Sequence, residues 1–356
     1  MNVLTLERRL EAFARLGRIF LRAAGEDVAL PRGDVASVER LTTAMPLSHR
    51  ANPWFDEENV RRALLALGSV LTEEKLRQWT ARYPQLQEER PVRDVLVIMA
   101  GNIPLVGFHD MLSVLVAGHR LIARTSSRDA GLHRLAAMIL TEVEPAFAER
   151  ITFTRERPQQ IDAVIATGSD NTARHFEYHY KGIPAIIRRN RNSLALLDGT
   201  ESDDELRGLA RDIFWYYGLG CRSVSKIFIP KDYDLEERLF PFFREHSAVN
   251  RLPSYRHNLA YQRAVFTMDG NPFLDAGNLL LTEDTALASP IGVLHYERYH
   301  DLSYVVNYVA TYVDKIQCLA GNIQAHIDPI PFGVCQFPEL GDYADGIDTM
   351  DFLLKI

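Results

Sequence analysis

The chain has 356 residues, of which 47% are hydrophobic and 24% are charged, which is the composition of an ordinary globular protein. Its 40 basic and 47 acidic residues give a net charge of −7, so nucleic-acid binding through a generally basic surface is not expected. No apolar run is long enough to span a bilayer, and residues 1–22 lack the uninterrupted apolar segment of a secretory signal.

The first 90 residues are predicted to form a helical, polar-rich region. Near its start, five apolar residues recur at helical spacing: Leu10, Phe13, Leu16, Ile19 and Phe20. Two further helices are expected over 56–67, ending at Gly68, and over 73–83. Pro91 marks the boundary with a different pattern.

From Asp94 onward, short apolar runs alternate with helical segments. Strands are expected over six segments: 94–100, 120–124, 151–154, 162–166, 184–188 and 193–197. Helices are expected over 105–117, with Pro104 in the first turn, over 130–143, and from Asp170. This alternation predicts a mostly parallel sheet that is covered by helices on both faces.

Beyond Asp198 the chain is predicted to continue with helices and strands. A helix is expected over 203–217, with an apolar face formed by Leu206, Leu209, Ile213 and Phe214. Four elements and a turn-rich tail follow: a strand over 225–230, a helix over 235–246, a strand over 291–296 and a helix over 302–313.

Cys221 follows a Gly-Leu-Gly turn, between the helix over 203–217 and the strand over 225–230. The flanking glycines let backbone and substrate approach the sulfur, and nearby amide N–H groups can face a developing oxyanion. The competing interpretation is an inert structural cysteine, although such a cysteine normally sits within an apolar run.

The cysteine count indicates a reducing compartment. Cys221, Cys318 and Cys335 cannot all pair and form no CxxC motif, so free thiols in the cytoplasm are expected. The 11 histidines and three cysteines show no zinc-ligand spacing, so no metal site is expected. His175 and His179, four apart on one helix, are interpreted as surface residues.

Polar residues follow two of the expected strands, and the first of them, Asn102, lies at the edge where open parallel sheets bind ligands. Asn102 follows the first strand and can donate to an oxyanion, or it caps the next helix. Thr167-Gly168-Ser169 opens a helix whose N-terminus suits a phosphate, or it is an ordinary connection with a capping Ser169 or Asp170.

Two basic segments have two interpretations each. In the first, Arg124, Ser126, Ser127 and Arg128 offer guanidinium and hydroxyl groups to a phosphate or ribose, or they form a solvated loop with serine helix caps. The second segment, residues 188–193 (RRNRNS), has a functional interpretation in which it binds cofactor phosphates or favours a thiolate through its positive charge. The competing interpretation is a solvated charged face.

Five segments carry a family resemblance. They are Gly101-Asn102-Ile103-Pro104-Leu105, residues 117–127, Thr167-Gly168-Ser169, Gly218-Leu219-Gly220-Cys221 followed by Ser225-Lys226, and Asn322 with Pro331-Phe332-Gly333. Their identity, order and spacing resemble the aldehyde dehydrogenase superfamily over roughly residues 90–340. Residues 101–110, 166–179, 188–193 and 330–353 are more specifically similar to LuxC-like acyl-CoA reductases.

The resemblance implies an α/β, aldehyde-dehydrogenase-like fold with a Rossmann-type parallel sheet. It divides the chain into a helical N-terminal region (1–90), an NADP-binding domain (91–197 with the tail 328–356) and a smaller α/β catalytic domain (198–327) that carries Cys221.

It also implies NADPH-dependent reduction of an acyl thioester, from CoA or a carrier, to an aldehyde through an acyl-Cys221 intermediate. Asn102 and the Cys221 amide stabilise the oxyanion, and Cys318 and Cys335 are bystanders. A homo-oligomer or an acyl-transferring partner subunit is left open.

Three departures from the superfamily pattern refine this expectation. Arg188 stands where hydrolytic members carry a general-base Glu, which favours exchange with a thiol over hydrolysis. Ser127 replaces the ribose-binding Glu, which favours NADPH, with Arg124 or Arg128 on the 2′-phosphate. Residues 288–290 (Ala-Ser-Pro) lack the Glu of the nicotinamide-ribose segment. An acyl-phosphate (semialdehyde-forming) reductase and a non-catalytic scaffold subunit are the alternatives.

Overall fold

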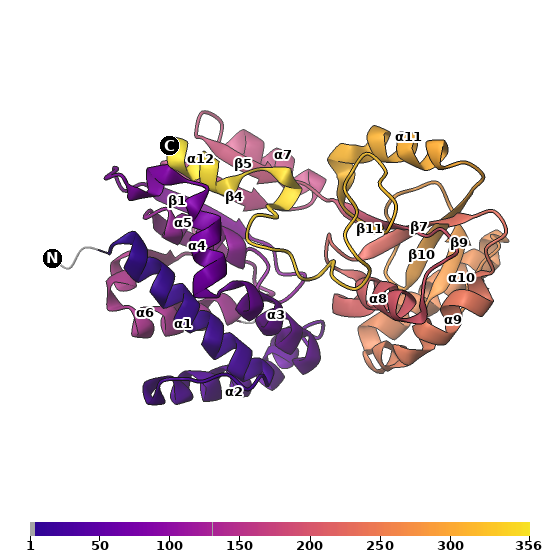
Figure 1. Ribbon diagram of the computed structural model, residues 1–356, viewed down its shortest axis with the longest axis horizontal. Helices are drawn as coiled ribbons and strands as arrows, with labels where there is room; N and C mark the ends of the chain where they lie inside the picture. The colour runs from indigo at the N-terminus through magenta and orange to yellow at the C-terminus, as the bar shows by residue number, and fades with distance from the viewer. Residues whose placement is uncertain (1–3, 130) are drawn as a thin grey trace. The chain divides into compact units, whose positions relative to one another are not determined.

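The computed structural model describes residues 4–129 and 131–356 and divides into two compact units (Figure 1). The first unit comprises the chain up to Asn190 together with Pro338–Ile356, and the second comprises Arg191–Phe337. Residues 1–3, in the expected N-terminal region, and Ala130, the expected start of the helix over 130–143, lie outside the described residues.

The first unit is built on a five-stranded parallel sheet with the order β3-β2-β1-β4-β5. Its strands are β1 (Asp94–Met99), β2 (Arg120–Thr125), β3 (Ile151–Phe153), β4 (Ala163–Thr167) and β5 (Ala185–Arg188). The strand order reverses between β1 and β4, which is the position where open α/β sheets bind ligands. The predicted parallel sheet is therefore confirmed.

Helices cover both faces of this sheet. Successive residues of a strand point to opposite sides, and the apolar residues on each side pack into a separate core. Val95, Val97 and Met99 pack in one core with α5 (Phe108–Val116) and α6 (Leu132–Val143). Leu96 and Ile98 pack in a second core with Phe176 and Tyr180, from the region of α7 (Asp170–His179). A short C-terminal helix, α12 (Thr349–Lys355), lies against α5.

The helical N-terminal region belongs to the first unit. Its helices are α1 (Leu6–Ala24), α2 (Val35–Ala51), α3 (Glu57–Val70) and α4 (Glu73–Ala81). The five apolar residues predicted to line α1 are all less than 5% exposed. Helix α2 was not predicted from the sequence; it contains Pro46 and buries only Ser37, Leu41, Met45 and Ser48.

Two helix boundaries in the first unit differ from the prediction by three residues. Helix α5 begins at Phe108 because Leu105 (φ 57°) and Gly107 (φ 87°) are left-handed, so Pro104 lies in the preceding turn. Gly68 lies inside α3 and does not end it. A β-carbon there would come within 2.7 Å of Leu21 Cγ, so Gly68 lets α1 and α3 pack closely.

The second unit has a six-stranded sheet with the order β11-β6-β7-β10-β9-β8, in which only β8 is antiparallel. The strands are β6 (Asn192–Leu196), β7 (Val224–Pro230), β8 (Leu274–Asp275), β9 (Leu280–Glu283), β10 (Val293–Tyr299) and β11 (Ile316–Gly321). Because β6 pairs with β7 and β11, the second unit starts at Arg191, whereas the sequence had led us to expect a boundary after residue 197.

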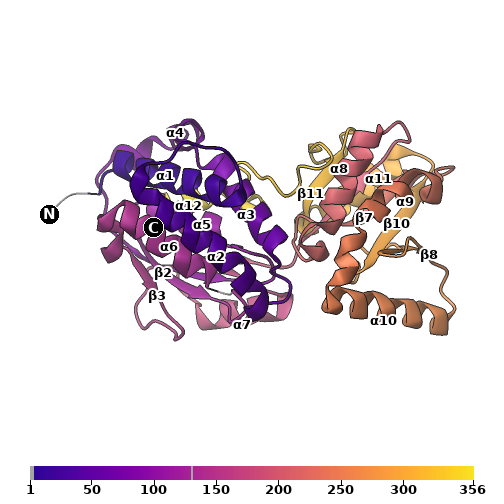
Figure 2. The ribbon, with the colours of Figure 1, turned by 90° about the horizontal axis from the view of Figure 1, so that it is seen from below.

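Four helices complete the second unit: α8 (Asp203–Phe214), α9 (Leu235–Glu245), α10 (Pro253–Asp269) and α11 (Leu302–Tyr312). Figure 2 shows α10 at the periphery of this unit. The unit ends at Phe337, and not before residue 328, since Ile330 bridges to Ala320 and the Phe337 ring contacts Trp215. Within the described residues, no helix has the length and apolarity to cross a membrane.

Candidate active site

The predicted site residues of the first unit come together at one edge of its sheet. Ile98 of β1 is in register with Arg124 of β2 and with Ala166 of β4. Since the strands are parallel, the Asn102 turn, the residues after Arg124 and the Thr167–Ser169 turn all leave the carboxyl edge of the sheet. This is the edge that the sequence analysis assigned to ligand binding.

The Asn102 turn lies against the loop that follows β2. A β-carbon built on Gly101 would lie 2.7 Å from Ser126 Cβ and 3.1 Å from Arg128 Cβ. Glycine is therefore required for this close approach. The helix-capping interpretation of Asn102 is wrong, because α5 begins after Gly107.

The loop after β2 leaves its cations available. Ser126 Oγ accepts a hydrogen bond from the Arg128 amide at 3.2 Å, while α6 begins after Gly131 without a side-chain cap, so the serine-cap interpretation is wrong. Within the part of the chain that the structure describes, Arg124 and Arg128 form no ion pair.

The turn after β4 forms as predicted. Ser169 caps α7, and its Oγ accepts from the Thr172 amide at 3.4 Å. A β-carbon on Gly168 would lie 2.9 Å from Thr172 Cβ, so the turn requires glycine. The remaining amides of the first turn of α7 provide a helix N-terminus at the carboxyl edge of the sheet.

Sequence reasoning missed Asn52, which joins these segments. Asn52 is 4% exposed, and its Nδ2 donates to the Gly101 carbonyl at 3.3 Å and to the Arg128 carbonyl at 3.0 Å. Its Oδ1 accepts from the Trp54 amide at 3.1 Å. A single asparagine in a turn after α2 belongs to no motif, so the sequence alone carried no signal for it.

The basic cluster 188–193 does not act as one group. Arg188 is 4% exposed; its Nη1 donates to Asp110 Oδ2 at 2.6 Å and its Nη2 to Thr349 Oγ1 at 2.9 Å. Arg189 pairs with Glu177, and Arg191 donates to the Ile316 carbonyl. Arg188 therefore ties β5 to α5 and α12, and neither earlier interpretation of the cluster describes it.

In the second unit, Cys221 is exposed and follows an unusual backbone segment. Helix α8 ends at Phe214 and not at residue 217, as predicted, because Tyr216 (φ 54°), Tyr217 (φ 57°) and Gly218 (φ 72°) are left-handed in succession. Such a conformation costs a non-glycine residue about 1–3 kcal/mol and is concentrated at functional sites. Burial of both tyrosine rings, at 5% and 7% exposure, holds it in place.

Neighbouring side chains anchor the Cys221 loop. Ser193 Oγ donates to the Cys221 carbonyl at 2.9 Å and lies 2.9 Å from Cys318 Sγ. Arg222 Nη1 lies 3.4 Å from the Cys335 carbonyl. The thiol is thus presented from a loop that β6 and the segment around Cys335 fix.

Asp212 of α8 holds that segment. It is 1% exposed and accepts from the Gly333 amide at 2.6 Å and from the Cys335 amide at 3.1 Å. Burial raises the pKa of Asp212 to about 6, against the opposing effect of these donors. The Pro-Phe-Gly motif of the sequence analysis is therefore a structural neighbour of the Cys221 loop.

Cys318 and Cys335 are buried, at 6% and 0% exposure. Hydrogen bonding to Cys318 and burial raise the pKa of the Cys335 thiol, which keeps it protonated. Of the three thiols, only Cys221 is exposed to solvent.

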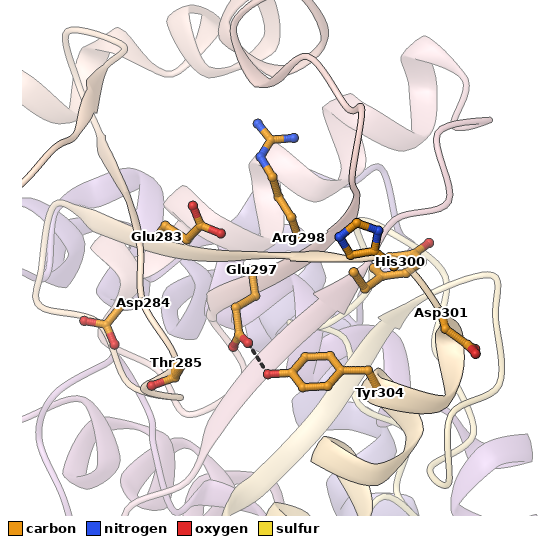
Figure 3. Close-up of a pocket in the computed structure, with 9 residues that line it drawn as sticks. Glu283, Asp284, Thr285, Glu297, Arg298, His300, Asp301 and Tyr304 are labelled. Atoms are coloured by element: carbon orange, nitrogen blue, oxygen red, sulfur yellow. Dashed lines mark hydrogen bonds between the residues drawn. The ribbon is translucent and has the colours of Figure 1, made fainter.

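A separate pocket of about 680 Å³ lies in the second unit (Figure 3). Its lining includes Glu283, Asp284, Glu297, Asp301 and Tyr304. The pocket lies where β9 and β10 end, whereas Cys221 precedes the start of β7, which is parallel to β10, so the two lie at opposite ends of the strands. Glu297 forms a 2.5 Å ion pair with Lys226, which is fully buried. The pocket contains none of the predicted site residues.

The family model described as acyl-CoA reductase (LuxC) matches residues 34–240, which is more than half of the chain. The chain belongs to the LuxC family of acyl-CoA reductases. A curated relative, the long-chain acyl-protein thioester reductase of Vibrio harveyi, is 26% identical over 153 residues. That match covers 38% of this LuxC-family chain and 31% of the relative, so the chain spans about a third of the relative's length.

Solved structures with the same fold are aldehyde dehydrogenases and related oxidoreductases. The acetylating aldehyde dehydrogenase of Geobacillus thermoglucosidasius is 12% identical with a TM-score of 0.56, and 86% of this chain and 74% of that one are covered. An oxidoreductase from Marinobacter aquaeolei is 11% identical with a TM-score of 0.61, and 86% of this chain and 71% of that one are covered. An NAD-dependent aldehyde dehydrogenase from Sinorhizobium meliloti is 12% identical with a TM-score of 0.57, and the match covers 85% of this chain and 72% of that one. At these identities the likeness shows the fold, which confirms the predicted aldehyde-dehydrogenase-like class.

The LuxC-family chain thus presents two sets of candidate residues, each described within its own unit. The first unit holds Asn102, the loop after β2 and the Thr167–Ser169 turn at one sheet edge. The second unit holds Cys221 and its supporting network. Among the described residues, no group of three or more His, Cys, Asp or Glu side chains is arranged to hold a metal ion.

Proposed function

We propose that this LuxC-family protein reduces an acyl thioester to an aldehyde with NADPH, through a covalent acyl-Cys221 intermediate. One observation carries the proposal: Cys221 is an exposed thiol on a loop that follows two left-handed tyrosines and is anchored by Ser193. Both other cysteines are buried.

The chemistry proposed for Cys221 is acyl transfer. The Cys221 thiolate attacks the thioester carbonyl, a carbon–sulfur bond forms, and the CoA or carrier thiolate leaves. Asn102 and the Cys221 amide are proposed as donors to the tetrahedral oxyanion. After reduction, the aldehyde departs and the Cys221 thiolate is regenerated.

Arg188 supports reduction over hydrolysis. Hydrolysis of an acyl-cysteine needs a base that activates water, and this chain has a buried arginine where hydrolytic relatives carry that base. A guanidinium is a donor only and offers no proton acceptor, and that of Arg188 is already bonded to Asp110 and Thr349. Transfer between thiols needs no such base.

The residues at the carboxyl edge of the first sheet suit a nicotinamide dinucleotide. Thr167, Gly168, Ser169 and the first turn of α7 are proposed to hold the pyrophosphate. The proposed contacts to the adenosine ribose and its 2′-phosphate are those of the loop after β2: Arg124, Ser126, Ser127 and Arg128. The absence of a carboxylate at the exposed Ser127 favours NADPH. When bound, the cofactor supplies hydride to the acyl carbon.

The acyl donor and partners follow from the relatives. The family description favours CoA, whereas the name of the Vibrio harveyi relative favours a protein-bound acyl group. We include both donors, a cytoplasmic location and either self-association or an acyl-transferring partner subunit in the proposal. The acyl-phosphate alternative loses its support, since Arg188 and Arg189 are already paired with carboxylates.

The test is NADPH oxidation, followed by absorbance, by the purified chain with a panel of acyl-CoAs. We expect oxidation that requires acyl-CoA, is lost in Cys221→Ala and is retained in Cys318→Ala, the matched buried control. Asn102→Ala is expected to lower kcat by about 10²- to 10³-fold. Oxidation by the Cys221→Ala variant would overturn the proposal.

A further inference from the structure

Four arginines gather where the strands of the first sheet begin, at the edge opposite the candidate site. Arg9 lies on α1, Arg90 and Arg93 precede β1, and Arg150 precedes β3. Backbone hydrogen bonds of 2.8 Å join the Arg93 carbonyl to the Arg120 amide and the Arg150 carbonyl to the Leu121 amide. We call Arg9, Arg90, Arg93 and Arg150 the Arg9 cluster.

Arg9 is a buried cation without a protein partner. It is 8% exposed, its Nε is buried without an acceptor, and its guanidinium makes no hydrogen bond or ion pair within the residues that the structure describes. A β-carbon on Gly118, which has a φ of 88°, would collide with Arg9 Nη1. A desolvated charge without a partner is costly, so the fold holds Arg9 against a free-energy penalty.

The rest of the cluster adds positive charge. Arg150 Nη1 donates to the Gly118 carbonyl at 3.1 Å, and Arg90 Nη1 donates to the Leu354 carbonyl at 3.1 Å. Both acceptors are neutral. Only Arg93 approaches a carboxylate, that of Asp162, at 3.6 Å. The Nε atoms of Arg90 and Arg93 are also buried without an acceptor.

Burial and the clustered positive charge lower the pKa values of two groups, Arg9 and His119. Burial and the charges of Arg150 and Arg90 lower the pKa of Arg9 to about 10, so it stays charged at neutral pH. Burial and the neighbouring arginines lower the pKa of His119, which is 1% exposed and hydrogen-bonded to the Leu353 carbonyl. His119 therefore neither adds nor compensates charge.

We propose that the Arg9 cluster binds a phosphate group, either the inorganic ion or a phosphate ester, with Arg9 as its central ligand. A guanidinium fork matches phosphate oxygens in a bidentate manner, and a dianion would offset the clustered positive charge. This site is distinct from the proposed cofactor site. The cluster lies where the parallel strands begin, whereas Arg124, Arg128 and Ser169 follow their carboxyl ends.

The first experiment is thermal unfolding of the full chain in sodium phosphate and in sodium chloride of equal ionic strength. The expected phosphate-dependent rise in Tm is roughly 3 °C at ten times Kd. Arg9→Met keeps an unbranched apolar stem similar to that of arginine and removes the charged guanidinium. It should abolish the phosphate shift, while its Tm in chloride is equal to or above that of the wild type.

Two further variants separate binding at this site from other causes. Arg124→Met should keep the phosphate shift, since it alters only the proposed cofactor site. Arg9→Lys retains the charge without the fork and should show a reduced shift, which provides a readout if Arg9→Met does not fold. Glycerol 3-phosphate in place of inorganic phosphate distinguishes an ester from the free ion, and a shift with either probe supports the site.

The outcomes that would overturn the proposal are specific. A wild type that neither phosphate nor glycerol 3-phosphate stabilises would exclude the ligand class. A full phosphate shift in both Arg9→Met and Arg9→Lys would place binding elsewhere. An Arg9→Met variant with a lower Tm in chloride and an unchanged phosphate shift would make Arg9 a structural residue.

Discussion

Asn52 and Gly101 are joined by a hydrogen bond from the side-chain amide of the first to the carbonyl of the second, and the same amide group also reaches the Arg128 carbonyl. Gly101 precedes the proposed oxyanion donor Asn102, and Arg128 belongs to the proposed ribose loop. The N-terminal helical region therefore contributes the residue that connects two parts of the candidate site.

Asn52→Ala should loosen both segments without removing a group that contacts substrate. Loss of these hydrogen bonds is expected to lower kcat/KM on the order of tenfold, chiefly through a higher KM for NADPH. Asn278→Ala is the matched control, because Asn278 is 1% exposed and its Nδ2 donates to the Phe243 carbonyl far from the proposed cofactor loops along the chain. A comparable rise in KM for NADPH in both variants would mean that Asn52 acts only on stability.

Ser193 is predicted to position the Cys221 loop. Ser193→Ala removes the hydrogen bond to the Cys221 carbonyl, and we expect kcat and the rate of Cys221 alkylation by iodoacetamide each to fall about five- to tenfold. Thr282→Val removes a hydroxyl of similar burial, whose partner is the Pro272 carbonyl, and should leave both rates near those of the wild type. Unchanged alkylation in Ser193→Ala would remove Ser193 from this role.

Asp212 should make stability depend on pH. Because burial raises its folded-state pKa from 3.8 to about 6, its contribution to the free energy of unfolding is most favourable below pH 3.8 and is lost as the pH rises through 6. The loss amounts to roughly 3 kcal/mol, at about 1.4 kcal/mol per pKa unit. Urea unfolding between pH 4 and 7 should show this decline in the wild type and a flatter profile in Asp212→Asn. Wild-type and Asp212→Asn profiles that decline equally with pH would contradict this role of Asp212.

Breaking the buried Arg188–Asp110 pair should strongly destabilise the first unit. Asp110→Asn leaves a buried guanidinium without its carboxylate and is expected to cost about 3–5 kcal/mol of unfolding free energy. The exposed pair of Arg189 and Glu177 is the control, since Glu177→Gln should cost at most about 1 kcal/mol. Equal losses in the two variants, measured by urea unfolding, would show that burial of the pair is not what matters.

Local chemistry explains what the sequence predicted well. The apolar runs of β1 and β4 are buried and follow strand patterns, and the glycine-bounded turns around Cys221 and Gly168 depend on residues that are adjacent in the chain. Helix α10 escaped prediction because it buries only Tyr255 and Leu259, which gives a weak helical pattern.

Long-range partners account for the rest. Arg188 was interpreted as part of a basic cluster, since its partners Asp110 and Thr349 are 78 and 161 residues away. Asn52 and Ser193 likewise act on segments that only the fold brings to them. The boundary at Arg191 depends on the pairing of β6 with β7 and β11, which a local pattern cannot reveal.

The central claim is that Cys221 carries the acyl group, and intact-protein mass spectrometry after incubation with acyl-CoA in the absence of NADPH tests it most directly. We predict one acyl adduct per chain in the wild type and in Cys318→Ala, none in Cys221→Ala, and release of the adduct as aldehyde when NADPH is added. An adduct that persists in Cys221→Ala, or an unmodified wild type with every acyl-CoA and acyl-carrier donor tried, would contradict the account.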